Sequence, residues 1–224
     1  ADIERVDILN TLAIDLRRND PDQGLVYAQQ ALELALKIEY KKGVRDAYNS
    51  KGSVLFGKGD YYQSLDLFQK SLALSMEMDE LSKIAHAYYA MGVIYRKLGK
   101  YPESLELELK ALKINEDLAD TLEMGNSYSN IGIVYTNMAK YSEALKNLFK
   151  AVQLQNSIDD VYGLASSQIG IGNVYFYQND LEKALEAYTE AMKIGEELED
   201  LRLISLCLDN IAGIYASKED YASA

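Results

Sequence analysis

Few residues of this chain could carry out catalytic chemistry. The sequence contains one histidine, His86, and one cysteine, Cys207. A nucleophilic mechanism needs a hydroxyl or thiol beside a base and an orienting group, and a zinc site needs three or four protein ligands, mostly His or Cys. A single residue of each type meets neither requirement and allows no disulfide within the chain. The sequence therefore predicts no enzyme, no cofactor and no metal site.

Carboxylates are plentiful, but their placement favours a structural interpretation. They gather at points about 40 residues apart, at Asp79-Glu80, Asp120, Asp159-Asp160 and Glu199-Asp200. A calcium loop would include glycine within the acidic run, and an acid–base pair would need apolar surroundings to separate two pKa values. We interpret these residues as helix-start charges that accept hydrogen bonds from free N–H groups.

The sequence Gly170-x-Gly172 resembles a phosphate-binding loop only superficially, because it continues as Asn-Val-Tyr inside an expected helix. Gly172 belongs instead to a column that returns every 40 residues. Glycine in a helix costs about 1 kcal/mol relative to alanine. Because alanine also occurs in the column, we expect small size to be required where the second helix of the same unit approaches. The column consists of Gly52, Gly92, Gly132, Gly172 and Ala212.

Each 40-residue unit reads as two antiparallel helices separated by a short turn. In one unit Tyr88, Gly92 and Tyr95 recur at spacings of three and four, which places them on one helical stripe. Pro21 and Pro102 stand at the first position of a second helix, where the missing N–H costs nothing. Aspartates precede several such helices as expected N-caps, at Asp20, Asp60, Asp180 and Asp220. Cys207 falls in a column of small residues and is predicted to be buried.

The repeats predict the fold class and the domain organisation. We expect an all-α, right-handed superhelical solenoid of antiparallel helix pairs, formed as one domain over residues 1–224. The chain stops where the second helix of a sixth unit would begin, so we expect it to be part of a longer protein. The predicted repeats span approximately residues 3–42, 43–82, 83–122, 123–162 and 163–202, with a partial sixth at 203–224.

Charge and hydropathy limit the partners. The formal net charge is −12, whereas nucleic acids and acidic membrane surfaces attract clustered Lys and Arg. No segment approaches the ~20 apolar residues that span a bilayer. We expect no nucleic-acid partner and no direct membrane contact by this chain.

These columns resemble the tetratricopeptide repeat family. Its pattern of an aromatic, Leu-Gly, Tyr, Gly-x-Tyr and small residues is similar to Tyr88-x-x-Met91-Gly92-x-x-Tyr95 followed by Gly99-x-Tyr101-x-x-Ser104 and Ala111. Lys51 in the Leu column and Glu108 in the second aromatic column depart from it. The resemblance covers essentially the whole chain and indicates a subgroup with 40-residue units.

The resemblance implies that the first helix of each unit lines a concave groove. Amides, cations and aromatic rings there suit the backbone of an extended peptide, although a merely solvated groove remains the alternative. The basic pair of a carboxylate clamp is absent. The groove positions are Asp46, Asn49, Ser53, Phe56, His86, Tyr89, Val93, Arg96, Lys97, Asn126, Ser129, Ile133, Asn137, Ser166, Ile169, Asn173, Phe176 and Tyr177. The predicted ligand-binding residues among them are Tyr89, Arg96, Asn126, Asn137, Asn173 and Tyr177.

The opening segment resembles the first repeat of sensor regions in bacterial histidine kinases and nucleotide cyclases. This resemblance implies a protein- or peptide-binding input region whose parent carries an output domain, with a periplasmic location favoured over a cytoplasmic one. The alternatives are an intracellular scaffold or adaptor and a module for self-association.

Overall fold

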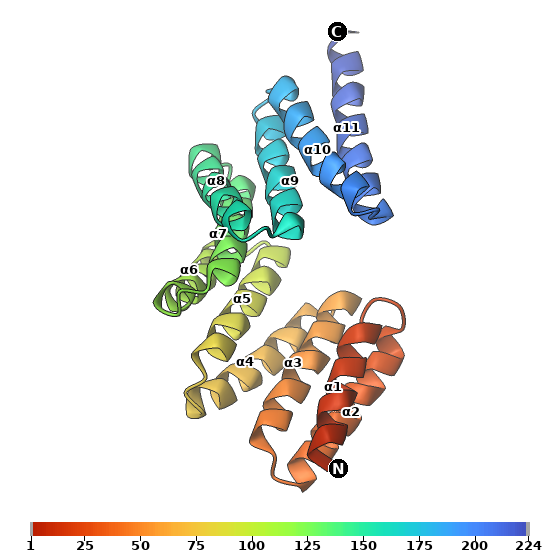
Figure 1. Ribbon diagram of the computed structural model, residues 1–224, viewed down its shortest axis with the longest axis vertical. Helices are drawn as coiled ribbons and strands as arrows, with labels where there is room; N and C mark the ends of the chain where they lie inside the picture. The colour runs from red at the N-terminus through yellow and green to blue at the C-terminus, as the bar shows by residue number, and fades with distance from the viewer. Residues whose placement is uncertain (1, 223–224) are drawn as a thin grey trace. The chain divides into compact units, whose positions relative to one another are not determined.

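The computed structural model describes the backbone of residues 2–222 and the side chains of residues 2–217. The described backbone is all-α, which confirms the predicted class of antiparallel helix pairs (Figure 1). Its eleven helices are α1 Asp2–Leu16, α2 Pro21–Lys37, α3 Lys41–Lys58, α4 Tyr61–Glu77, α5 Leu81–Lys97, α6 Tyr101–Asp117, α7 Thr121–Asn137, α8 Tyr141–Ser157, α9 Val161–Tyr177, α10 Leu181–Glu197 and α11 Leu201–Ala222.

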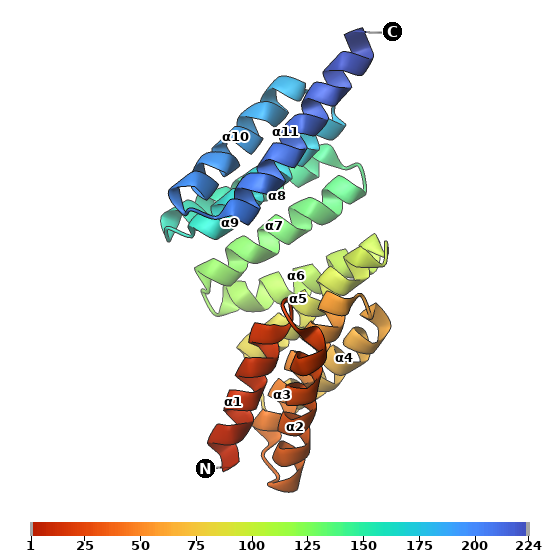
Figure 2. The same ribbon diagram turned by 90° about the vertical axis from the view of Figure 1, so that its right-hand side faces the viewer.

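Contacts divide the chain into two compact units, unit 1 (residues 1–114) and unit 2 (residues 115–224), with the division inside α6. In unit 1, α1 packs against both α2 and α3, as Figure 2 shows. In unit 2, α7 packs against α8 and α9 in the same way. Thus α1 and α7 each contact the helix that follows and the next odd-numbered helix of the same unit.

Short turns join the helices from α2 onward, with two residues between α3 and α4 and three elsewhere, and each contains one residue with positive φ. Gly59 and Gly99 supply two of these residues, and seven are not glycine. The following N–H bonds back to the carbonyl five residues earlier, as from Asp160 to Gln155 at 2.9 Å, which is the Schellman closure of a helix. The same following residue precedes the next helix as its N-cap, so one residue ends one helix and starts another.

This turn geometry corrects part of the interpretation of the acidic pairs. Asp79, Asp159 and Glu199 do not cap helix starts but occupy the left-handed position, with φ between 53° and 54°. The second acid of each pair is the N-cap. Asp160 accepts from the Gly163 N–H at 3.0 Å and Asp120 from the Glu123 N–H at 3.1 Å, whereas Glu80 makes no capping bond.

The left-handed turns make a stability prediction. Ala119, with φ of 52°, carries a Cβ that this region disfavours, so Ala119→Gly is expected to stabilise unit 2 by about 1 kcal/mol. The exposed Ala212 lies inside α11, where Gly is expected to destabilise by about the same amount. Urea unfolding followed by circular dichroism measures both. Destabilisation by Ala119→Gly would contradict the turn geometry.

The glycine column meets the second helix of its own unit, as the sequence predicts. A Cβ built on Gly132 would lie 2.6 Å from Leu148 Cγ, and one on Gly172 would lie 2.5 Å from Tyr188 Cε1. Gly92 likewise faces the side chain of Glu108. The facing residue follows 16 positions later each time. In the first 40-residue repeat the large and small residues exchange places. Leu12 stands in the glycine column, and the residue 16 positions later is the fully buried Ala28.

The serine column has a role beyond small size. The Ser64 hydroxyl donates to the Gly52 carbonyl at 2.7 Å, and Ser104 donates to the Gly92 carbonyl at 2.8 Å. These bonds join the two helices of a unit at the point of closest approach.

One predicted boundary is wrong. The sequence places a turn before Asp220 and an N-cap at Asp220, but α11 continues as a single helix to Ala222. Residues 217–222, SKEDYA, contain no glycine or proline that would end the helix.

Candidate functional site

An apolar hollow of about 220 Å³ opens on the face of unit 1 formed by α1, α3 and α5. Phe56 comes from α3 and Tyr89 from α5, and the buried Phe68 of α4 closes the floor. We call this site the apolar hollow. Its lining residues are Arg17, Ser53, Phe56, Phe68, His86, Tyr89, Ala90 and Val93.

His86 lies at the rim of the apolar hollow, with its ring 6.4 Å from that of Tyr89. Surrounding protein atoms and the Lys83 ammonium lower the pKa of His86, against a smaller opposite effect of Asp46. The lowered pKa favours the neutral imidazole, which offers one donor and one acceptor. This chemistry suits hydrogen bonding to a ligand rather than charge.

A second hollow of about 360 Å³ lies on the same three helices, nearer their N-terminal ends. We call it the polar hollow, because side chains with hydrogen-bonding groups make up most of its lining. Its residues are Asp7, Asn10, Thr11, Ile14, Asp46, Asn49, Ser50 and Lys83.

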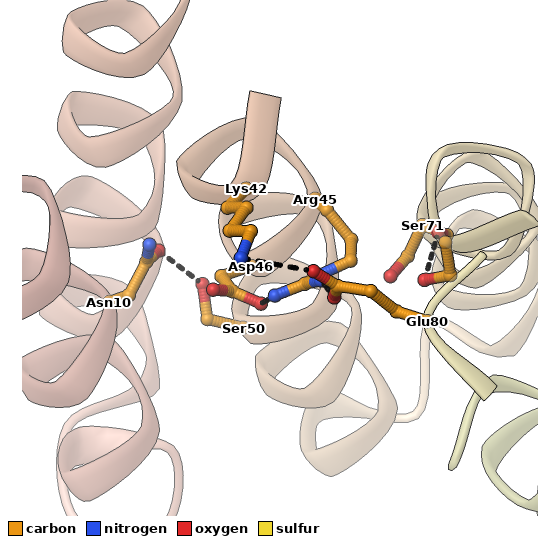
Figure 3. A network of polar contacts seen from close by, with 8 residues as sticks. Asn10, Lys42, Arg45, Asp46, Ser50, Ser71 and Glu80 are labelled. Atoms are coloured by element: carbon orange, nitrogen blue, oxygen red, sulfur yellow. Dashed lines mark hydrogen bonds and ion pairs between the residues drawn. The ribbon is translucent and has the colours of Figure 1, made fainter. Parts of the chain in front are cut away.

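A buried arginine supports one wall of the polar hollow (Figure 3). Arg45 is only 4% exposed, and its Nε and Nη2 donate to Asp46 Oδ1 at 2.9 and 2.8 Å. Its Nη1 pairs with Glu80, which also lies 3.3 Å from Lys42 Nζ. Because Glu80 is engaged in this way, it leaves the N-terminus of α5 without a side-chain cap. Arg45 thereby connects α3 to the start of α5.

Two amide atoms of the polar hollow lack hydrogen-bond partners among the described residues. Asn10 is 8% exposed, and its Oδ1 accepts from Ser50 at 3.0 Å while its Nδ2 bonds to nothing. Asn49 leaves its buried Oδ1 without a partner. A buried donor or acceptor without a partner costs about 1–3 kcal/mol. These two atoms have almost no accessible surface, so a ligand that supplied one acceptor and one donor would remove that cost only after the side chains turn outward.

Two predicted binding residues lie in unit 1, both on α5. Tyr89 lines the apolar hollow. Arg96 is half-buried about two turns further on, close enough to the fully buried Glu108 for their charges to interact. Burial lowers the pKa of Arg96 and the Glu108 charge raises it. Arg96 thus interacts with the carboxylate of Glu108 from the same 40-residue repeat, and the position of Arg96 in the sequence did not reveal this.

The other four predicted residues lie in unit 2. Asn173 of α9 accepts from the Tyr188 hydroxyl at 2.7 Å, and Asn126 of α7 lies 3.5 Å from Glu123. Asn137 and Tyr177 are exposed at the C-terminal ends of α7 and α9. Asn173 and Tyr177 lie one turn apart, whereas Asn126 and Asn137 lie near opposite ends of α7. A binding role for all six residues stays a prediction.

Sequence reasoning missed the contribution of α1 to both hollows. Extending the repeat columns backward from Asp46, Asn49 and Ser53 reaches Val6, Leu9 and Ala13, which are all buried. The residues that line the polar hollow follow one position after these, at Asp7, Asn10 and Ile14. The hydrophilic character of Asp7 and Asn10 in an otherwise leucine-rich segment was the available signal.

Other expectations from the sequence can be compared with the described residues. Cys207 is fully buried, as predicted, and burial raises the pKa of its thiol. No group of three or more His, Cys, Asp or Glu side chains within residues 2–217 is arranged to hold a metal ion. Among the helices described, none has the length and apolar character to cross a lipid bilayer.

Comparison with family models identifies the class of protein. The tetratricopeptide repeat model matches residues 43–117 and 123–197, which together exceed half of the chain. The chain therefore belongs to the tetratricopeptide repeat family, whose repeats form protein-interaction modules and are generally not catalytic. No protein with a curated description matches it.

Solved structures share the fold at low sequence identity. A Rap protein complexed with competence and sporulation factor matches with 16% identity, a TM-score of 0.72, 98% of this chain and 66% of that one. A signal transduction ATPase with numerous domains and a tetratricopeptide repeat sensor, from Pyrococcus horikoshii, matches with 19% identity and a TM-score of 0.75. The match covers 97% of this chain and 34% of the ATPase. A putative kinesin light chain repeat protein from Podosopora anserina matches with 14% identity and a TM-score of 0.69. The match covers 87% of this chain and 96% of that protein. This chain thus spans less than two thirds of the Rap protein and about a third of the ATPase.

Proposed function

We propose that the face of unit 1 formed by α1, α3 and α5 binds an extended segment of a peptide or partner protein. The observation that carries this proposal is the pair of hollows on that face. One offers aromatic walls, and the other offers amide atoms without partners. Extended peptides bind through backbone hydrogen bonds together with pockets for side chains, and the two hollows supply both.

We further propose that the chain is the sensory or regulatory input region of a larger bacterial signalling protein. Two structural neighbours support this, since one is solved in complex with competence and sporulation factor and another is described as a signal transduction ATPase with a tetratricopeptide repeat sensor. An adaptor that only holds partners together is the alternative. The parent reading frame separates the two: a kinase or cyclase domain supports the input region, and further repeats or a disordered tail support the adaptor.

The binding face is tested with two matched substitutions. Random peptides are selected for binding to the whole chain, and their affinities are measured by isothermal titration calorimetry. Val93→Glu places a charge in the apolar hollow and is expected to weaken binding by about tenfold or more, because burying an unpaired charge is costly. Val26→Glu on the exposed side of α2 is the control and should leave affinity unchanged. Equal affinities for Val93→Glu and the parent chain would exclude this face.

A further inference from the structure

The two hollows lie at a fixed separation along three helices. On α1 the polar hollow is centred near residues 10–11, and the apolar hollow is reached at Arg17, the residue that follows the helix. On α3 the corresponding centres are near residues 48 and 54–55, and on α5 they are Lys83 and residues 89–90. The offset is six to seven residues each time, or about 10 Å at 1.5 Å per helical residue. An extended chain covers that distance in about three residues.

The apolar hollow suits an uncharged, hydrophobic side chain. Phe56, Tyr89, Ala90 and Val93 provide apolar walls, and an aromatic or large aliphatic side chain would bury its surface against them. Its charged rim residue is Arg17, whose Nη1 donates to the Ile14 carbonyl at 2.9 Å. A cation in this hollow would meet the like charge of Arg17.

The polar hollow suits a cation. Asp7 contributes a whole carboxylate and Asp46 contributes its Oδ2, because Asp46 Oδ1 already accepts from Arg45. Asn49 adds its unpartnered Oδ1. The cations around it are Lys83 on the α5 wall and Arg45 behind Asp46, but Arg45 is already held by Asp46 and Glu80. Asp7 has an exposed carboxylate with no ion pair among those described. The unpartnered Nδ2 of Asn10 is a donor for a backbone carbonyl beside the bound cation.

We propose that the bound segment carries a lysine or arginine three positions from a large hydrophobic residue. This proposal rests on the proposed function and adds the chemistry of the ligand. The basic side chain lies between Asp7 and Asp46, and the hydrophobic side chain fills the apolar hollow beside Tyr89. The formal net charge of −12 favours the approach of such a basic segment.

The probe is a displayed library of random peptides, each about a dozen residues long. Peptides that bind the whole chain are selected from it. The expected result is enrichment of Lys or Arg three positions from Phe, Leu, Ile or Met, in one direction along the peptide. Fluorescence anisotropy then compares Asp7→Lys with Asp15→Lys, a matched change at an exposed acid on α1 that lines neither hollow. Asp7→Lys should weaken binding about tenfold, and more at low salt, whereas Asp15→Lys should change it less than about threefold.

A double-mutant cycle locates the basic residue. Changing that residue to alanine should weaken binding to the parent chain but have little effect on binding to Asp7→Lys. Ser53→Phe fills the apolar hollow without removing a core side chain, so it should abolish the preference for the hydrophobic residue. Circular dichroism confirms that each variant folds.

The results distinguish this inference from the proposed function. If the selected peptides share another motif, or show no coupling to Asp7, and are still lost with Val93→Glu, the motif is wrong and the binding face stands. If no peptide is enriched, or if Val93→Glu binds the peptides normally, both the proposed binding face and the proposed motif are wrong.

Discussion

Replacing Gly132 by leucine is expected to destabilise unit 2 by about 3 kcal/mol or more, because the added side chain has no space. Its Cβ would lie 2.6 Å from Leu148 Cγ and 3.2 Å from the Ala144 carbonyl oxygen. The latter is backbone, so it cannot move aside by changing rotamer. Urea unfolding followed by circular dichroism measures the loss.

Two further variants show that the loss comes from close approach. Gly213 has no atom within 4 Å of an added Cβ, so Gly213→Ala should stabilise α11 by up to about 1 kcal/mol. Adding Leu148→Ala to Gly132→Leu copies the natural Leu12 and Ala28 pair, and should recover part of the lost stability. If Gly132→Leu unfolds at the same urea concentration as the parent chain, the packing argument fails.

The second large effect is expected at Glu80. Glu80→Gln removes one of the two carboxylates that hold the buried Arg45 and should destabilise unit 1 by about 2 kcal/mol, since a buried charge is left only partly paired. Adding Arg45→Met removes the charge itself and should restore much of the stability. Urea unfolding measures both variants.

Glu77→Gln provides the control, because the pair of Glu77 with Lys41 is exposed on both sides. Its expected effect is below about 1 kcal/mol. If Glu80→Gln and Glu77→Gln cost the same, Arg45 does not depend on Glu80 for its burial.

Spacing alone was enough to predict the helix pairs and the glycine contacts. The 40-residue return of Gly92 and Gly132 determines which helix faces meet, because residues three and four apart share one side of a helix. The turn conformations were not predictable in the same way. Ala119 and Glu199 are not residues that favour positive φ, and they adopt it because packing on both sides requires a three-residue turn.

The candidate site was less predictable, for two physical reasons. The repeat-column positions on α1 hold core residues such as Val6 and Leu9, so the residues that line the polar hollow lie one position after the columns. Some polar residues at groove positions also interact with other residues of the protein and not only with a ligand. Asn173 accepts a hydrogen bond from Tyr188, and the charge of Arg96 interacts with that of Glu108. Sequence position alone does not separate these residues from Tyr89, which lines a hollow.

The central claim is that the α1, α3 and α5 face of unit 1 is the binding surface. A crystal structure of the whole chain with a selected peptide tests it most directly. We predict an extended peptide along that face, with one side chain beside Tyr89 and Phe56 and another beside Asp7. A peptide bound to the outer helices α2 and α4, or to α11, would contradict the claim.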